Sequence, residues 1–183
     1  MRVKYSVAVD EGKVKEYKLK RQKNLDKYKR QYEERKEFHK LLKEYASDII
    51  ASENFRSTRN YIQHGSMPVY RHCMDVADQS IKISKLLRVN CNERELIRGA
   101  LLHDYFLYDW HDKNHIHKRP HGFYHPQAAL DNARQDFLLN EREENMIKRH
   151  MFPLTLVPPR YKEAWILCYI DKVCSGRETV KRS

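Results

Sequence analysis

The sequence predicts an all-α fold, a bundle of about six to seven helices preceded by a basic helical arm. Apolar residues recur at helical spacing through most of the chain, and the whole chain contains only five glycines to interrupt them. Signals typical of helix starts precede several of the periodic segments. Weak strand-like alternation is confined to residues 1–10, where one short strand could form.

Residues 1–38 are predicted to be the arm, and residues 39–183 the main domain. Residues 13–46 mix Lys, Arg, Glu and Tyr with few helix breakers, as a solvated helix or helix pair does. Residues 1–40 hold fourteen Lys and Arg against seven Asp and Glu, which accounts for seven of the eleven net positive charges of the chain. A basic chain of this kind suits an anionic partner or substrate.

The main domain is predicted to begin with the amphipathic segment 41–62. In the next helix, residues 69–88, apolar side chains share one face with His72, so this histidine points inward. Residues 92–105 are predicted to form an apolar helix that ends with a His-Asp pair, His103-Asp104. Two adjacent titratable groups at the end of an apolar run need a compensating charge.

The last three predicted helices also carry polar residues at their ends or inner faces. Pro126 suits the first turn of a helix that runs to about residue 139, which places His125 at or near its N-terminal cap. Asn140 followed by Glu143 is typical of a capping box, so a short helix is predicted from there to His150. In the final helix an aspartate shares one face with apolar residues at i, i+4 and i+7: Leu167, Asp171 and Cys174.

Each inward polar residue has an ordinary structural explanation when it is taken alone. A lone buried histidine is usually hydrogen-bonded, and a lone aspartate can border a groove. As a set they are harder to explain, because burial of two uncompensated carboxylates is costly or forces them into the neutral form. One shared metal centre would compensate all of them together.

Composition argues against a membrane or disulfide-dependent protein. No apolar stretch approaches the roughly 18 residues needed to cross a bilayer, and the N-terminus lacks the apolar core of a secretory signal. We therefore expect a cytoplasmic protein with no membrane partner. The four cysteines have no CxxC spacing and are expected to be reduced, mostly buried thiols: Cys73, Cys91, Cys168 and Cys174.

Three short motifs hold these inward residues in a fixed order. His72 lies in Val-Tyr-Arg-His-Cys, the His103-Asp104 pair in Leu-Leu-His-Asp, and Asp171 in Tyr-Ile-Asp-Lys. This order resembles the HD-domain superfamily of metal-dependent phosphohydrolases, over roughly residues 40–175. A second His-Asp pair, His111-Asp112, lies in a polar segment with no apolar helical face and is rejected.

The resemblance implies an HD-domain helical bundle with one or two divalent ions and a catalytic centre at His103 and Asp104. The ligands of the first ion would be His72, His103, Asp104 and Asp171. Members with two ions place further histidines between the pair and the last aspartate, and His125 and His150 occupy such positions here. Asp104 would then bridge both ions. His121 and His117 compete with His125 for the second site, and His125 is preferred because a helix start follows it.

Imidazole and carboxylate donors without thiolates suit transition metals. Iron or manganese is preferred, and zinc, cobalt, nickel or magnesium are possible. The implied activity is hydrolysis, by a metal-activated hydroxide, of a phosphoester of a nucleotide or another small phosphorylated metabolite. Four residues of the basic segment after the pair are the candidates for substrate binding: Lys113, Lys118, Arg119 and His121. The alternative is a solvated loop that happens to be basic.

Two other functional classes stay open on sequence grounds. Some relatives of this fold use the same four-histidine, two-aspartate set around two irons as an oxygenase. Alternatively, residues 13–40 could contact nucleic acid through Lys, Arg and three tyrosines, Tyr17, Tyr28 and Tyr32. Interspersed acidic residues favour a solvated helix with i, i+4 pairs over this second alternative. The physiological substrate, the native metal and the oligomeric state do not follow from the sequence.

Overall fold

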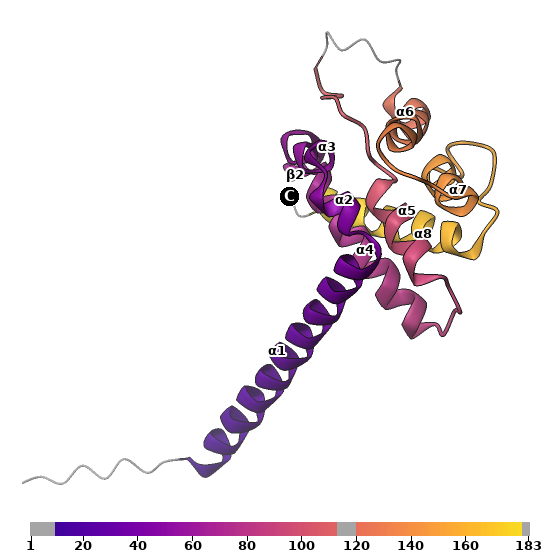
Figure 1. The fold of residues 1–183 in the computed structure, drawn as a ribbon. Coiled ribbons are helices and arrows are strands. Elements are labelled where there is room, and N and C mark those ends of the chain that lie inside the picture. Colours follow the sequence, from indigo (N-terminus) through magenta and orange to yellow (C-terminus); the bar gives the residue numbers. More distant parts are fainter. Residues whose placement is uncertain (1–9, 113–119, 181–183) are drawn as a thin grey trace, which may run out of the picture. The chain divides into compact units, whose positions relative to one another are not determined.

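The computed structural model describes residues 10–112 and 120–180 and divides into two compact units, residues 1–40 and 41–183, which we describe separately (Figure 1). The described part of the first unit is helix α1 (Glu11–Tyr45), a single uninterrupted helix whose last residues belong to the second unit. Its side chains are largely exposed and pair along the helix, as Gln22 does with Asp26 at 2.9 Å. The strand predicted for residues 1–10 lies outside the described residues, apart from position 10.

The second unit begins with short elements where the sequence showed one amphipathic segment, residues 41–62. Leu41 and Leu42 are buried, but the chain then breaks at Ala46 and again at Ser52. Ser52 is extended, and its hydroxyl accepts a hydrogen bond from the Phe55 backbone N–H at 3.2 Å, which starts a new helix. The elements formed are α2 (Ser47–Ala51), α3 (Glu53–Ser57) and the 3-10 turn η1 (Thr58–Asn60).

A small antiparallel hairpin that the sequence did not predict leads into the central helices. Strand β1 (Ile62–His64) pairs with β2 (Met67–Pro68), and Gly65 turns the chain with a positive φ of 61°. A residue without a Cβ adopts this conformation at little cost. The hairpin holds Gln63 in a buried position beside the core.

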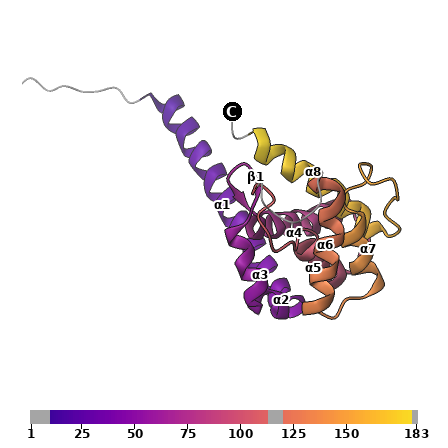
Figure 2. The same cartoon turned by 90° about the horizontal axis from the view of Figure 1, so that it is seen from above.

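The remaining helices form the core of the second unit (Figures 1 and 2). Helix α4 packs against α5 and α8, while α7 packs against α5, α6 and α8. Their bounds are α4 (Val69–Leu86), α5 (Glu93–Leu102), α6 (His121–Asp136), α7 (Glu141–Arg149) and α8 (Lys162–Val180). The described residues thus contain eight α-helices and one short hairpin, so the predicted all-α class is confirmed.

Two features bring α5 and α7 together. A Cβ built on Gly99 of α5 would lie 2.6 Å from the sulfur of Met146 on α7, so any larger residue would require Met146 to shift. Beside it, the buried Arg98 donates to Glu143 at 3.0 Å and to Asp48 at 2.7 and 2.9 Å. These contacts fix the position of α7 along α5.

The start of α6 corrects a prediction. The helix begins at His121 after the extended Pro120, and Pro126 lies inside it, so His125 is a helical residue and not an N-terminal cap. A proline at position 126 removes only the N–H that would bond the Gly122 carbonyl, and α6 continues through this loss. The prediction failed because it took the first proline-compatible turn from Pro126 alone.

Other helix ends follow the sequence signals. The capping box of Asn140 and Glu143 is confirmed, with Asn140 accepting from the Glu143 N–H at 3.0 Å and Glu143 accepting from the Asn140 N–H at 3.0 Å. Helix α5 ends at Leu102, one residue before the predicted His-Asp pair. All four cysteines are free, and Cys91 alone among them is not buried. Within the described residues, no helix has both the length and the apolar character to cross a membrane.

Candidate metal centre

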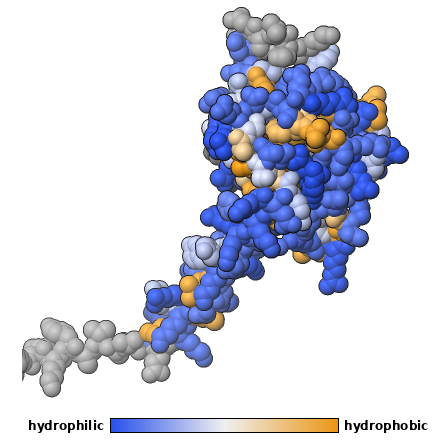
Figure 3. Space-filling model, viewed as in Figure 1, coloured by the Kyte–Doolittle hydropathy of each residue, from blue (hydrophilic) through white to orange (hydrophobic). Residues whose placement is uncertain are grey.

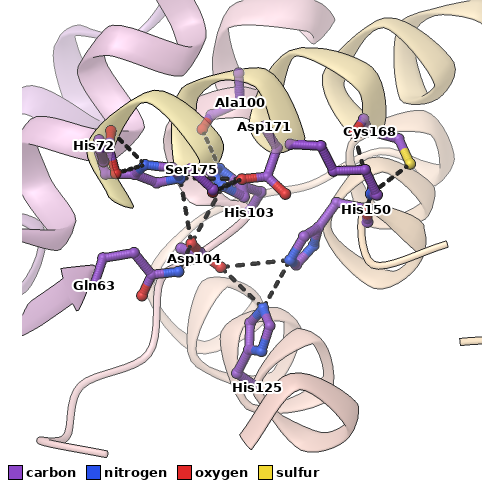
Figure 4. A network of polar contacts seen from close by, with 12 residues as sticks. Gln63, His72, Ala100, His103, Asp104, His125, His150, Cys168, Asp171 and Ser175 are labelled. Carbon is purple, nitrogen blue, oxygen red and sulfur yellow. Dashed lines mark hydrogen bonds and ion pairs between the residues drawn. The ribbon is translucent and has the colours of Figure 1, made fainter. Parts of the chain in front are cut away.

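Six buried side chains from five elements converge in the second unit (Figure 4). His72 comes from the first turn of α4, and His103 with Asp104 directly follows the end of α5. His125 lies in α6, His150 directly follows α7, and Asp171 lies in the middle of α8. These six are the residues that the resemblance assigns to the metals.

Asp104 lies between two groups of possible ligands. Its Oδ2 is 3.3 Å from His103 Nε2 and 3.6 Å from His72 Nε2. Its Oδ1 is 3.1 Å from His125 Nε2 and 3.4 Å from His150 Nε2. Each carboxylate oxygen of Asp104 therefore faces a different group, which is the arrangement of a bridging ligand.

The first group is completed by Asp171. Its Oδ1 is 3.1 Å from His72 Nε2 and 3.6 Å from His103 Nε2. The two groups that could each hold an ion, with ligand atoms within 4.8 Å of one another, are His72, His103, Asp104 and Asp171, and Asp104, His125 and His150.

In the second group, His125 Nε2 lies 2.8 Å from His150 Nε2. Two N–H groups cannot face each other at this distance, so at least one of these nitrogens presents a lone pair. His103 Nε2 and Asp104 Oδ1 are also buried and make no well-aligned hydrogen bond within the described residues. Such atoms fit a site where a cation lies between them.

The outer nitrogens of the four histidines explain why their Nε2 atoms face inward. His103 Nδ1 donates to the Ala100 carbonyl at 2.8 Å, and His150 Nδ1 donates to the Ile147 carbonyl at 2.8 Å. His125 Nδ1 donates to the His121 carbonyl at 3.1 Å. A carbonyl only accepts, so each of these Nδ1 atoms carries a proton and the neutral ring offers Nε2 to a metal.

His72 has a carboxylate in the same role. Its Nδ1 lies 3.1 Å from both oxygens of Glu178, in the last turn of α8, and the Glu178 side chain is only 8% exposed. Sequence reasoning missed Glu178, although it lies seven residues after Asp171 and so shares its helical face. Gln63 was also missed; its Nε2 donates to Asp104 Oδ2.

The electrostatics of the site show strong mutual compensation. Burial opposes ionisation of Asp104, but His103 and His125 hold its pKa well below the usual value. Burial also disfavours the charged form of His72, yet Asp171 and Glu178 raise its pKa to about 10. Without a metal ion, protons on the imidazoles balance the carboxylates. A divalent cation can take the place of these protons.

A cavity of about 780 Å³ opens onto the centre. Asp104, His125, His150 and Asp171 form part of its lining, together with Gln63, Lys172 and Ser175. The other lining residues are mainly apolar or aromatic: Trp110, His121, Gly122, Met151, Pro153 and Leu154. The cavity is large enough for a small organic molecule, and such a molecule would contact the candidate metal ligands in its lining.

The predicted substrate-binding residues are placed only in part. His121 lines the cavity, where its ring stacks on Trp110 at 4.7 Å and on His125 at 4.6 Å between centroids. His121 belongs to neither group of possible ligands, whereas its competitor His125 does. The other candidates, Lys113, Lys118 and Arg119, and the alternative ligand His117, lie outside the described residues.

The rejected pair, His111-Asp112, lies away from this arrangement. Both residues are exposed, and His111 Nδ1 pairs with Asp109 at 3.3 Å. Neither belongs to a group of possible metal ligands among the described residues. A His-Asp dipeptide alone is therefore not informative, and the apolar helix before it is what distinguishes the buried pair.

The donor set fits a pair of divalent transition metals. It contains four imidazoles and two carboxylates, all buried, with no thiolate among them. Such mixed donors suit iron, manganese, cobalt, nickel or zinc, and they differ from the thiolate-rich sets of structural zinc sites. The hydrogen bonds to the outer histidine nitrogens are those that metal-binding histidines usually make.

Comparison with known proteins agrees with this geometry. The family model of the HD domain matches residues 69–176, more than half of the chain and the segment that contains all six residues. No curated protein and no solved structure matches the chain.

Proposed function

The chain belongs to the HD domain family, and from this premise we propose that it is a phosphohydrolase with two divalent ions. The proposed ligands are His72, His103, Asp104, His125, His150 and Asp171. The observation that carries the proposal is the position of Asp104, whose two oxygens face two separate groups of donors at 3.1 to 3.6 Å.

Ions bound at these residues would supply a hydroxide nucleophile near neutral pH and would stabilise charge on phosphoryl oxygens. The chain itself holds the ligands in place. Gln63 orients the Asp104 carboxylate, and Glu178 orients the His72 ring. Because both contacts are preformed and largely buried, little reorganisation is needed when the metals bind.

Lys172 is proposed to contact the substrate phosphate. It follows Asp171 directly, and among the described lining residues it is the one lysine or arginine. Its ammonium donates to the His150 carbonyl at 2.9 Å and to the Cys168 carbonyl at 3.2 Å, so the group is held beside the backbone of the candidate ligand His150. A cation there can offset charge on phosphoryl oxygens.

The walls of the cavity support a substrate with an apolar or aromatic part. Trp110, Met151, Pro153 and Leu154 line the same cavity as the candidate ligands, and the volume of about 780 Å³ exceeds the needs of phosphate alone. A nucleotide or another small phosphorylated metabolite fits this description. Iron or manganese remains the preferred metal on donor type, with zinc, cobalt, nickel or magnesium as the other possibilities.

The experiment compares two aspartates that each follow a histidine. Protein is purified without added metal or chelator, its metal content is measured by elemental analysis, and phosphate release is measured on a panel of nucleotides and small phosphoesters. Asp104→Asn should lose bound metal and phosphate release, while Asp112→Asn should retain both. Equal metal content and activity in the two variants would contradict the proposal.

The same preparation separates hydrolysis from oxygenation. Phosphate release that depends on metal and continues without oxygen supports the proposed activity. Oxygen-dependent consumption of a small polyol or phosphonate, with no phosphate release from any ester of the panel, would refute it.

A further inference from the structure

Charged residues are unevenly distributed around helix α1 between residues 12 and 40. Successive helical residues are rotated by about 100°, so side-chain directions follow from position. Between residues 12 and 40, every acidic side chain projects into one sector about 100° wide. These residues are Glu16, Asp26, Glu33, Glu34 and Glu37. Three basic residues share that sector: Lys15, Lys23 and Arg30.

The rest of the helix surface is basic and aromatic. Nine of the twelve Lys and Arg between residues 12 and 40 project there: Lys13, Lys18, Lys20, Arg21, Lys27, Lys29, Arg35, Lys36 and Lys40. Along the middle of this surface lie Tyr17, Tyr28 and Tyr32, exposed by 67%, 69% and 66%. We call these twelve residues the basic–tyrosine face. In Figure 3, small apolar patches lie among hydrophilic side chains along α1.

We propose that the basic–tyrosine face binds single-stranded nucleic acid. Nine cations that project outside the acidic sector are complementary to a chain of phosphates, and of these Lys13 also pairs with Asp10 at 3.6 Å. The exposed phenol rings can stack on bases, which are accessible in a single strand and not in a duplex. The five acidic residues between positions 12 and 40 lie in the other sector, so they weaken this surface less than their number suggests.

The same residues disfavour two other occupants. A helix that enters a bilayer surface needs a continuous apolar face, but here Arg21, Arg35 and His39 share the stripe of the tyrosines. A second copy docked through the same face would bring like charges together, which is unfavourable. The proposal concerns α1 alone and does not depend on the activity of the metal centre.

The test uses the full chain and a fluorescein-labelled 15-nucleotide oligouridylate, with binding measured by fluorescence anisotropy at several salt concentrations. The face variant is R21Q/K27Q/K36Q, and the matched control is K15Q/K23Q/R30Q. Both remove two lysines and one arginine from the same helix. Circular dichroism of each variant checks that the helix is retained.

The chain should bind the oligonucleotide with a Kd of about 1–100 µM at moderate salt. The face variant should bind about tenfold more weakly, and its salt dependence should fall by about two units of log–log slope. The control variant should differ from the unmodified chain by less than about threefold. Equal losses in both variants would refute a defined face.

The tyrosines are tested by Y28L/Y32L, which keeps two helix-compatible residues. Loss of two stacking rings should weaken binding of the single strand by about tenfold or more, with little change for a duplex of the same length. Unchanged single-strand binding, or tighter binding of the duplex by the unmodified chain, would overturn the proposal. So would binding to phosphatidylserine vesicles, or self-association through α1, in the absence of oligonucleotide binding.

Discussion

The contact between Glu178 and His72 gives a direct test of how the centre is preorganised. The Glu178 carboxylate accepts a hydrogen bond from His72 Nδ1 at 3.1 Å, and the Glu178 side chain is only 8% exposed. It therefore fixes the ring so that Nε2 faces Asp171 and Asp104. Loss of such an outer partner typically lowers metal affinity by about 10–100-fold.

Two substitutions of Glu178 separate the effect of its charge from the effect of its hydrogen-bond acceptor. Glu178→Gln keeps an acceptor oxygen but removes the charge, so we expect about a tenfold loss of affinity, or about 1.4 kcal/mol. Glu178→Ala removes the acceptor as well, and the loss should approach about 100-fold, or about 2.7 kcal/mol. The metal ligands themselves are unchanged in both variants.

The assay is competition for manganese or zinc between the protein and a chromophoric chelator. Glu53→Gln serves as the control, because Glu53 is exposed and takes no part in the contacts of the centre. Affinities of both Glu178 variants within about twofold of the unmodified protein, with an intact circular dichroism spectrum, would refute the assigned role of Glu178.

Three further predictions concern stability and proton balance. Arg98→Ala removes the buried cation of Glu143, leaves it the half-exposed Arg94 at 3.5 Å, and should lower the free energy of unfolding by about 3 kcal/mol in urea; a loss below about 1 kcal/mol would contradict this. Gly99→Ala places a Cβ against Met146 and should cost about 1–3 kcal/mol; an unchanged urea midpoint would show that α7 shifts freely. In the metal-free protein the pKa of His72 is about 10, so the ring is protonated at neutral pH and metal binding must release protons. Calorimetry in buffers of different ionisation enthalpy should detect this release, and metal affinity should rise between pH 6 and 8; an affinity independent of pH would contradict it.

Part of the cluster of candidate ligands could be predicted, because His72 and Asp171 lie on faces that local periodicity determines. His72 and Asp171 share helical faces with apolar residues, and both are buried. The apolar run before His103 and Asp104 distinguishes them from the exposed pair at 111 and 112. Caps are equally local, which is why the box of Asn140 and Glu143 was recognisable.

Contacts between distant segments could not be predicted in this way. Gln63 reaches Asp104 across 41 residues and Glu178 reaches His72 across 106, through a hairpin and a last helical turn that no local pattern connects to the centre. The break at Ser52 and the start of α6 at His121 likewise depend on competing local signals that packing resolves.

The amino-acid sequence alone placed His72 and Asp171 on inward faces of their helices, because the helical repeat of 3.6 residues assigns each position to a face. It also determined that residues 1–40 carry seven of the eleven net positive charges. Only the tertiary structure decided that the two oxygens of Asp104 face different donors, because that depends on how far each helix is shifted along its neighbours. Close packing, such as that of Gly99 against Met146, sets those shifts. Contacts of this kind between helices leave no repeating pattern in the sequence from which they could be predicted.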